Sequence, residues 1–211
     1  MIRLYLETSI SPKRVTSIEK SFLDAYLNHL FADLKELECQ VIPVGGKDKL
    51  HLVVNQYEEC ALSGGRNLTI FDADEAVDGG GFEVRQKALL EKFGELGITS
   101  ELFLFPNNKD DGDFESLLER IVNKDHSGLL TCFERYETCV KTRNKPEEAP
   151  IYKAPNRKAK MYSYVDAMVK SRSKDRAFKD GNWFFDNPEY WDLEADALIP
   201  LRSFLEKFIR M

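Results

Sequence analysis

Short apolar runs alternate with longer amphipathic stretches over the first 125 residues of the chain. The apolar runs predict four strands, at residues 2–6, 39–44, 67–71 and 99–105. The stretches between and after them have apolar positions close to a 3.6-residue period, and they predict helices at residues 17–37, 47–62, 82–97 and 113–122. Gly97 is suited to the C-terminal cap of the third helix, and Asp113 to the N-cap of the fourth.

Alternation of strands and helices with short links predicts parallel strands, because a parallel pair needs a long return path that a helix provides. Strands buried on both faces read as continuous apolar runs, as "IRLYL" and "ELFLF" do. The predicted fold is therefore α/β: a mainly parallel, Rossmann-like sheet flanked by helices. We assign this core to residues 1–140 and a C-terminal helical extension, packed on the core, to residues 141–211.

The extension begins with a change in amino-acid composition. Residues 141–160 carry three prolines and many charges, which predicts a loop or linker. A helix is expected near residues 157–170, then an irregular aromatic stretch at 181–193, and a closing helix at 198–211. The aromatic side chains could stack nucleic-acid bases, but aromatics in a closing segment more often pack against a core, and packing is the prediction.

The overall composition is that of an ordinary globular protein, with 43% apolar and 31% charged residues. No window approaches the roughly 18–20 consecutive apolar residues that span a bilayer, so no membrane association is predicted. The N-terminal residues also lack the pattern of a secretory signal, and the expected location is the cytoplasm.

Charge is distributed unevenly along the chain. The net charge is −6, yet residues 141–179 hold 12 lysines and arginines against four acids, a balance of +8, which leaves −14 on the remainder. A basic segment on an acidic body is expected where one surface meets a polyanion, which predicts contact with DNA or RNA through residues 141–179. A merely solvated, partly flexible segment has the same composition. The acidic remainder could instead dock another protein.

Four cysteines are widely spaced and form no CxxC pair, so a zinc site is not favoured. In a cytoplasmic chain they predict reduced and mostly buried thiols. Cys132 and Cys139 lie seven residues apart, which is two helical turns and places them on one helix face.

Polar and acidic groups follow each predicted strand. These are Glu7 after the first strand, the segment "GGKD" with Gly45, Gly46 and Lys47 after the second, Asp72, Asp74 and Glu75 after the third, and Asp113 and Glu115 after the fourth. Carboxyl ends of parallel strands meet at one edge of the sheet, where α/β proteins bind ligands. The sequence therefore predicts that these groups gather at one site.

Asp72 and Asp74 are two residues apart, so they point to the same side if the strand geometry continues that far. With Glu7 they would form a set of three carboxylates, which is costly unless a cation neutralises it. Mg²⁺ or Mn²⁺ suits such oxygen ligands, and two ions about 4 Å apart could serve the displacement of a phosphodiester. The other interpretation is an acidic loop without a metal, because an isolated DxD pattern is common.

Two other phosphate-handling patterns fit poorly. The GxxxxGK[ST] spacing of a nucleotide-binding P-loop is absent. A phosphotransferase of the haloacid-dehalogenase type is a weak alternative, since that fold places its nucleophilic Asp on the first strand of its core. Here two strands precede "DADEA".

The pattern resembles the Toprim domain of primases, type IA and type II topoisomerases and OLD-family nucleases, in which a Glu follows the first strand and a DxD follows the third. It is more closely similar to an uncharacterised Toprim-like family of small prokaryotic proteins. The motifs that carry the resemblance are "YLE" (5–7), "VGGKDKL" (44–50), "FDADEAVDGGG" (71–81) and "FPNNKDDGDFESLL" (105–118). The resemblance extends over essentially the whole chain.

The resemblance implies a role for three residues: Asp72 and Asp74 would bind Mg²⁺, and Glu7 would act as general acid/base. One position departs from the usual "EGxxD" pattern of Toprim proteins, because Thr8 stands in place of the glycine and the following Asp is missing or displaced. The departure bears on the pose of Glu7, and so on catalysis more than on metal binding.

The predicted function is a Mg²⁺-dependent (or Mn²⁺-dependent), nuclease-like protein that acts on phosphodiesters. Further acidic candidates for the site are Glu75, Asp113 and Glu115, and phosphate-contact candidates are Gly45, Gly46, Lys47 and Lys49. The alternatives left open are a catalytically silent module that binds nucleic acid or a nucleotide, and a module that interacts with another protein. The pattern does not fix the oligomeric state.

Overall fold

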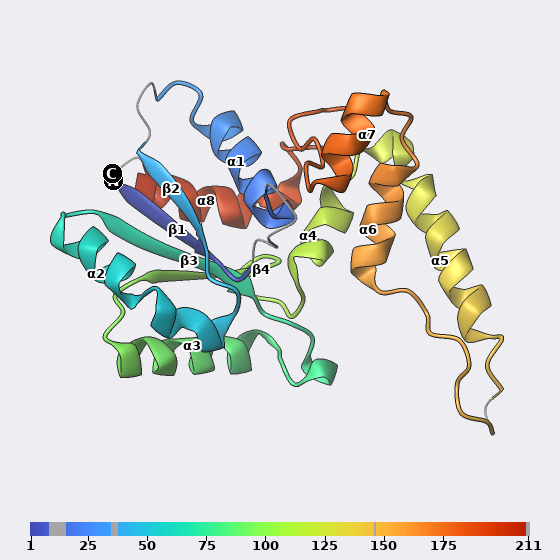
Figure 1. The fold of residues 1–211 in the computed structure, drawn as a ribbon, viewed down its shortest axis with the longest axis horizontal. Coiled ribbons are helices and arrows are strands. Elements are labelled where there is room, and N and C mark those ends of the chain that lie inside the picture. The colour runs from blue at the N-terminus through green and yellow to red at the C-terminus, as the bar shows by residue number, and fades with distance from the viewer. Residues whose placement is uncertain (9–15, 35–37, 146, 210–211) are drawn as a thin grey trace.

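The computed structural model describes residues 1–8, 16–34, 38–145 and 147–209. Within them the strands form a single four-stranded parallel sheet in the order β2-β1-β3-β4 (Figure 1). The strands are β1 (Ile2–Leu6), β2 (Cys39–Pro43), β3 (Arg66–Asp72) and β4 (Glu101–Phe105). The expected α/β class, with parallel strands flanked by helices, is confirmed.

Helices cover both faces of the sheet (Figure 1). On one face lie α1 (Ile18–Leu30) and α8 (Ile199–Ile209), and on the other α2 (Val54–Leu62) and α3 (Phe82–Leu96). Neighbouring strand residues point to opposite faces, so Leu4 packs with the α1 and α8 side and Tyr5 with the α2 and α3 side. This explains why the strands read as continuous apolar runs.

The rest of the chain adds helices beyond the carboxyl ends of the strands (Figure 1). They are α4 (Phe114–Ile121), α5 (Gly128–Lys141), α6 (Arg157–Asp166) and α7 (Arg172–Lys179). Short 3-10 turns are η1 (Lys47–Leu52), η2 (Ala76–Asp78), η3 (Lys124–His126) and η4 (Asp196–Leu198). Buried residues of α6 and α8 belong to the same apolar core as those of β1 and α1. The division of the chain at residue 140 stays a prediction.

Most predicted elements are present with shifted ends. Residues 47–62 form η1 and then α2, because the helix is interrupted at Val53. The first helix ends at Leu30, and residues 35–37 and 210–211 of the predicted helices lie outside the described residues. Both predicted caps are confirmed: Oδ1 of Asp113 accepts from the N–H of Ser116 at 2.8 Å, and Gly97 is left-handed with φ 66°. Helix α7 was not predicted, and α5 was expected only through the shared helix face of Cys132 and Cys139.

The aromatic closing segment packs into the core, as predicted. Trp183, Phe185, Tyr190 and Trp191 are all buried. The prediction for the cysteines was wrong in part, because Cys132 and Cys139 are exposed on α5. That helix buries none of its described residues, so its apolar side does not enclose the thiols.

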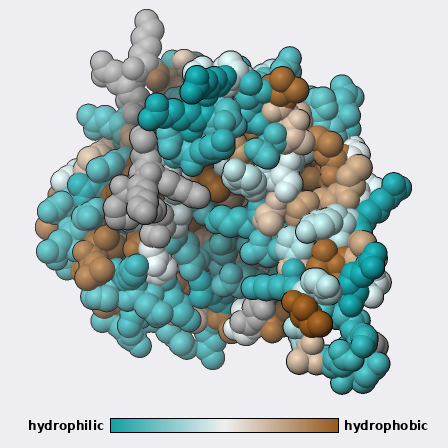
Figure 2. Space-filling model, turned by 45° about the vertical axis from the view of Figure 1, so that its right-hand side comes forward, coloured by the Kyte–Doolittle hydropathy of each residue, from teal (hydrophilic) through white to brown (hydrophobic). Residues whose placement is uncertain are grey.

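The surface is mixed in character. Figure 2 shows hydrophobic residues reaching the surface in separate places among hydrophilic ones, on the side that carries the added helices. Helices α5 and α6 and their connecting loop extend away from the sheet (Figure 1). None of the helices in the described part of the chain is long and apolar enough to cross a bilayer.

Candidate functional site

The carboxyl ends of β1 and β3 lie side by side in the middle of the sheet. The connections that leave β1 and β3 run over opposite faces of the sheet, through α1 and α3. Open α/β sheets bind ligands at the strand ends where this change of face occurs. Glu7 directly follows β1, and Asp72 ends β3. The backbone N–H of Asp72 donates to Oε2 of Glu7 at 3.1 Å. The structure therefore brings together two acids that the sequence placed at these strand ends.

A cavity of about 70 Å³ lies at these two strand ends. Three acidic residues line it, Glu7, Glu19 and Asp72, and we call it the acidic cavity. Glu19 lies in the first turn of α1, which begins after the N-cap Ser17. Glu19 is not among the residues expected from the sequence, although an acid in the first turn of the helix that follows β1 is a readable signal.

Asp72 differs from Glu7, Asp74 and Glu75 because no basic side chain of the described residues pairs with its carboxylate. Its Oδ1 accepts from the N–H of Phe114 at 2.9 Å, at the start of α4. No lysine or arginine of the described residues forms an ion pair with its carboxylate. Burial, and then the charges of Glu7 and Glu115, raise the pKa of the Asp72 carboxyl well above its ordinary value. Such a carboxylate is stabilised by a proton or by a bound cation.

Arg85 of α3 is the cation closest to the expected metal ligands. Its guanidinium forms an ion pair with Oε1 of Glu7, lies 3.4 Å from Oδ2 of Asp74, and donates through Nε to the backbone carbonyl of Asp72 at 3.3 Å. The Arg85 side chain is only 13% exposed. This role could not be predicted from the sequence, because the position of Arg85 depends on how α3 returns along the sheet.

The turn after β3 separates Asp72 from Asp74. The strand ends at Asp72, and Asp74 is left-handed with φ 59°. A side chain on Gly80 would come within 2.5 Å of Cβ of Asp74, so the glycine lets the chain fold back over this residue. The extended geometry that would aim both carboxylates at one point does not continue to Asp74, which meets Arg85 instead.

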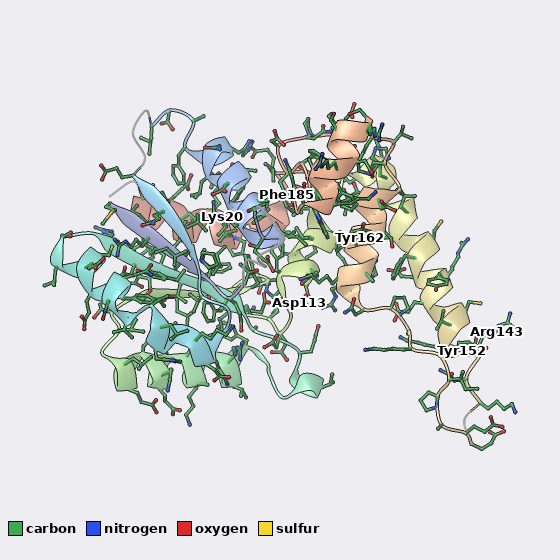
Figure 3. The ribbon with its side chains drawn as sticks, viewed as in Figure 1. Lys20, Asp113, Arg143, Tyr152, Tyr162 and Phe185 are labelled. Atoms are coloured by element: carbon green, nitrogen blue, oxygen red, sulfur yellow. The ribbon has the colours of Figure 1, made fainter. Side chains whose placement is uncertain are left out.

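A second group of acids faces α6. Arg157 binds Oε1 of Glu75 at 3.1 Å, Oδ1 of Asp113 at 3.0 Å and Oε1 of Glu119 at 3.3 Å. It also donates to Oγ of Ser116 at 2.8 Å. Burial opposes the charge of Arg157, but the surrounding carboxylates outweigh it and raise the pKa of the guanidinium. We call Arg157 and the acids that it binds the α6 clamp. Figure 3 shows Asp113 where α4 begins, beside α6.

Glu115 lies between the two groups. Its side chain is 12% exposed, and Oε1 lies 3.5 Å from Nζ of Lys158. Burial raises the pKa of the Glu115 carboxyl, and Lys158 opposes that shift. Glu115 also contributes to the raised pKa of Asp72. Lys158 thus pairs with an acid whose charge acts on Asp72, and forms no ion pair with Asp72 itself.

The loop after β2 reaches the same edge of the sheet. The N–H of Gly45 donates to the carbonyl of Thr8 at 2.9 Å, which ties this loop to the residue after Glu7. Lys47 is partly buried and Lys49 is exposed. Contact of Gly45, Gly46, Lys47 and Lys49 with a phosphate stays a prediction.

The donor chemistry of the acidic cavity fits a hard divalent cation, because carboxylate oxygens are ligands that Mg²⁺ and Mn²⁺ prefer. The arrangement of the possible ligands around such a cation is less complete. Across the described residues, no group of three or more His, Cys, Asp or Glu side chains is arranged to hold a metal ion. Mg²⁺ commonly binds through one or two carboxylates and completes its shell with waters and phosphate oxygens. Asp72 with one neighbour from the cavity meets that smaller requirement.

The positive charge of the basic segment 141–179 is partly neutralised by ion pairs, both with acids of the segment and with acids elsewhere in the chain. Six of its basic side chains pair with acids: Lys141, Lys145, Arg157, Lys158, Lys160 and Lys179. Arg172 and Arg176 are exposed on α7 and lie one helical turn apart, with Lys179 on the same side of the helix. Exposed bases that form no ion pair among the described residues lie on α7 and also before α6: Arg172, Lys174 and Arg176, and Arg143 and Lys153.

No family model, curated protein or solved structure matches the chain. The residues and their geometry carry the functional argument.

Proposed function

We propose that this protein is a Toprim-like, divalent-cation-dependent protein that acts on the phosphodiester bonds of a nucleic acid. The observation that supports it is Asp72: a partly buried carboxylate at the strand switch point, with a raised pKa and without a basic partner among the described residues. Structural acids in the same region have such partners, as Glu75 and Asp113 do. An unbalanced acid facing a small cavity is what a cation site requires.

In this proposal Asp72 holds Mg²⁺ or Mn²⁺, with Glu7 or Glu19 as a second ligand from the same cavity. The cation would polarise a phosphoryl oxygen and lower the pKa of a bound water. Glu7 is oriented by the N–H of Asp72 and by Arg85, so its carboxylate is fixed toward β3. Lys47 and Lys49 lie in the loop tied to Thr8 and would contact the phosphate backbone.

Calorimetric titration of Mn²⁺ and Mg²⁺ into the wild type, Asp72→Asn and Glu58→Gln tests the cation site. Glu58 is an exposed acid on α2, so Glu58→Gln removes the same charge away from the cavity. We expect binding in the wild type and in Glu58→Gln, and at least about tenfold weaker binding in Asp72→Asn because a direct ligand is lost. Equal binding by all three proteins would show that any cation sits elsewhere.

Cleavage of labelled single-stranded and duplex DNA and RNA in Mn²⁺ tests the reaction. Glu7→Gln and Asp72→Asn are expected to abolish cleavage, and Glu58→Gln to retain it. A chain that binds the cation but cleaves none of these polymers would contradict the enzymatic part of the proposal.

That last outcome defines the second candidate, a catalytically silent module that binds nucleic acid. One observation favours it: both oxygens of Glu7 already have donors, Arg85 and the N–H of Asp72, so Glu7 is held as a structural acceptor. A general acid/base must exchange a proton with the substrate, so an orientation already fixed by two donors of the protein favours a structural role for Glu7. Turnover in Mn²⁺ separates the two candidates.

A further inference from the structure

A second pocket, of about 180 Å³, lies between α6, α7 and the start of α1. Phe178 and Trp183 are buried beneath it, whereas Tyr162 is 39% exposed. The ring centroid of Tyr162 lies 4.7 Å from that of Phe178, so one side of the tyrosine ring is supported. We call this pocket, with Tyr162, Trp183, Lys158 and Lys179 among its lining residues, the aromatic pocket. Figure 3 labels Tyr162 on α6.

The wall of the aromatic pocket is fixed by a close backbone approach. Gly181 has φ 104°, and a side chain at this position would come within 2.8 Å of the carbonyl oxygen of Thr16. A glycine is therefore required for the turn after α7 to touch the chain just before α1. The pocket is a built feature of the fold, since three separate segments meet there.

Two ammonium groups join the aromatic surface. Lys158 and Lys179 line the pocket, and their side chains are 53% and 59% exposed. Each pairs with one acid, Glu115 at 3.5 Å and Asp175 at 2.7 Å. An ammonium group has three donors, so one pairing leaves others for an anionic ligand. A supported ring beside exposed cations is the combination that binds a nucleobase together with its phosphate.

The aromatic pocket and the acidic cavity are lined by consecutive residues at the start of α1. Ile18 lines the aromatic pocket, and the next residue, Glu19, lines the acidic cavity. Lys158 makes a second connection, because it pairs with Glu115, one of the acids that act on Asp72. A chain of nucleotides held at one pocket would therefore continue toward the other.

We propose that the aromatic pocket binds one unstacked base of a single-stranded polynucleotide, with the base against Tyr162 and an adjoining phosphate at Lys158 and Lys179. Its volume is well below the roughly 300–1,000 Å³ of pockets for drug-sized ligands, so it accommodates one ring system rather than a whole ligand of that size. A base within a duplex is stacked on both faces and is not free to enter. The inference deepens the proposed function, on which it rests for the direction of the strand.

The test measures binding of fluorescein-labelled oligonucleotides of about 12 nucleotides by anisotropy in EDTA, so that the cation site does not contribute. The probes are single-stranded DNA, single-stranded RNA and a blunt DNA duplex. The proteins are the wild type, Tyr162→Ala, Tyr162→Phe and, as a matched control, Tyr136→Ala, which removes an exposed tyrosine of α5 outside the pocket.

We expect Tyr162→Ala to weaken single-strand binding by roughly 5- to 150-fold, the range found for loss of one base–aromatic stack. Tyr162→Phe keeps the ring and should bind like the wild type, as should Tyr136→Ala. Duplex binding should not respond to Tyr162→Ala. The base-stacking assignment would be overturned if Tyr162→Ala left the affinity for single strands unchanged, or if it lowered the affinity for the duplex.

Photocrosslinking of the unmodified protein provides a second test that does not depend on the stability of a variant. A single-stranded probe carrying 5-iodouracil is irradiated with the wild type, and the attached peptide is sequenced. Attachment to the peptide containing Tyr162 or Trp183 supports the assignment, and attachment only elsewhere overturns it. The two proposals can fail separately. Binding that depends on Tyr162 without any cleavage would contradict the enzymatic function but not the base-binding pocket. Cleavage that is unchanged in Tyr162→Ala would contradict the base-binding pocket but not the enzymatic function.

Discussion

Two groups of acids at the same edge of the sheet differ in how their charge is balanced. The α6 clamp surrounds Arg157 with Glu75, Asp113 and Glu119, and it joins α6 to the turn after β3 and to α4. In the acidic cavity, the carboxylate of Asp72 has only a backbone donor among the described residues. The first group holds the extension in place, and the second has an unmet requirement for positive charge. Acid content by itself does not distinguish the two groups; their partners do.

Among the substitutions considered, Arg85→Gln should have the largest effect on stability. It removes the cation that Glu7 and Asp74 share, and the Arg85 side chain is mostly buried. We expect the free energy of unfolding to fall by about 3 kcal/mol, because breaking one partner of a buried ion pair leaves uncompensated charge. Urea denaturation in EDTA measures the change.

Adding millimolar Mg²⁺ should restore part of the stability lost in Arg85→Gln, since a bound cation replaces the guanidinium. Lys92→Gln is the control, because it removes an exposed cation that pairs with Glu95 on the same helix. A loss in Arg85→Gln no greater than in Lys92→Gln would mean that Arg85 does not balance the acids at the strand ends.

Arg157→Ala tests the α6 clamp and should cost about 2 kcal/mol of unfolding free energy. The value is discounted from that of a fully buried pair, because the Arg157 side chain is 35% exposed and solvent screens its ion pairs. Arg157→Lys keeps the charge but loses the planar fork, and should recover only part of the loss. Thermal or urea unfolding that is unchanged in Arg157→Ala would show that the clamp does not hold α6.

Asp72→Asn should act in the opposite direction and stabilise the metal-free protein by about 1 kcal/mol at neutral pH. Asparagine still accepts the N–H of Phe114 but carries no charge into a buried site. The pKa of Asp72 is raised in the folded state, so its contribution to stability is full below the ordinary pKa of an aspartate and is lost as the pH rises through the raised value.

The stabilisation by Asp72→Asn should therefore shrink toward zero as the pH falls to about 4. Unfolding in EDTA across this pH range measures the trend. A destabilised Asp72→Asn at neutral pH would contradict the idea that the Asp72 carboxylate lacks a balancing charge.

Lys158→Gln should have the smallest effect, a loss of about 0.5 kcal/mol or less. Its ammonium pairs with Glu115 at 3.5 Å and is more than half exposed, so solvent screens the interaction. A loss as large as that of Arg157→Ala would place Lys158 within the α6 clamp and weaken the case for it as a free phosphate contact.

The strands and the acids that follow them were predictable because their signals are local. The strands lie close to their predicted positions, since each is a continuous apolar run, and the meeting of Glu7 with Asp72 follows from parallel strand order. Arg85 and Arg157 were not predictable, because each pairs with acids far away in the sequence. Their partners depend on where a helix packs after it crosses over the sheet, and a local sequence pattern does not determine that position.

Helices α5 and α7 show two different limits. Helix α7 is mostly charged, with Phe178 as its buried residue, and it lacks the apolar stripe that predicts a core-facing helix. Helix α5 has apolar residues at helical spacing, Leu129, Phe133, Tyr136 and Val140, yet it buries none of its described residues, so this pattern indicated a helix but not a buried one. The left-handed Asp74 was missed for a related reason: an i, i+2 spacing predicts a shared direction only while the backbone stays extended.

The apolar core on the α1 side of the sheet has a consequence for the order in which the protein can fold during its synthesis. Leu4 of β1 and Leu205 of α8 belong to the same core, about 200 residues apart in the chain. At roughly 5–20 residues per second, a ribosome takes about 10–40 s to add the later residue after the earlier one. During that interval the part of this face that α8 covers stays exposed beside α1, and a chaperone that shields apolar surfaces would bind there.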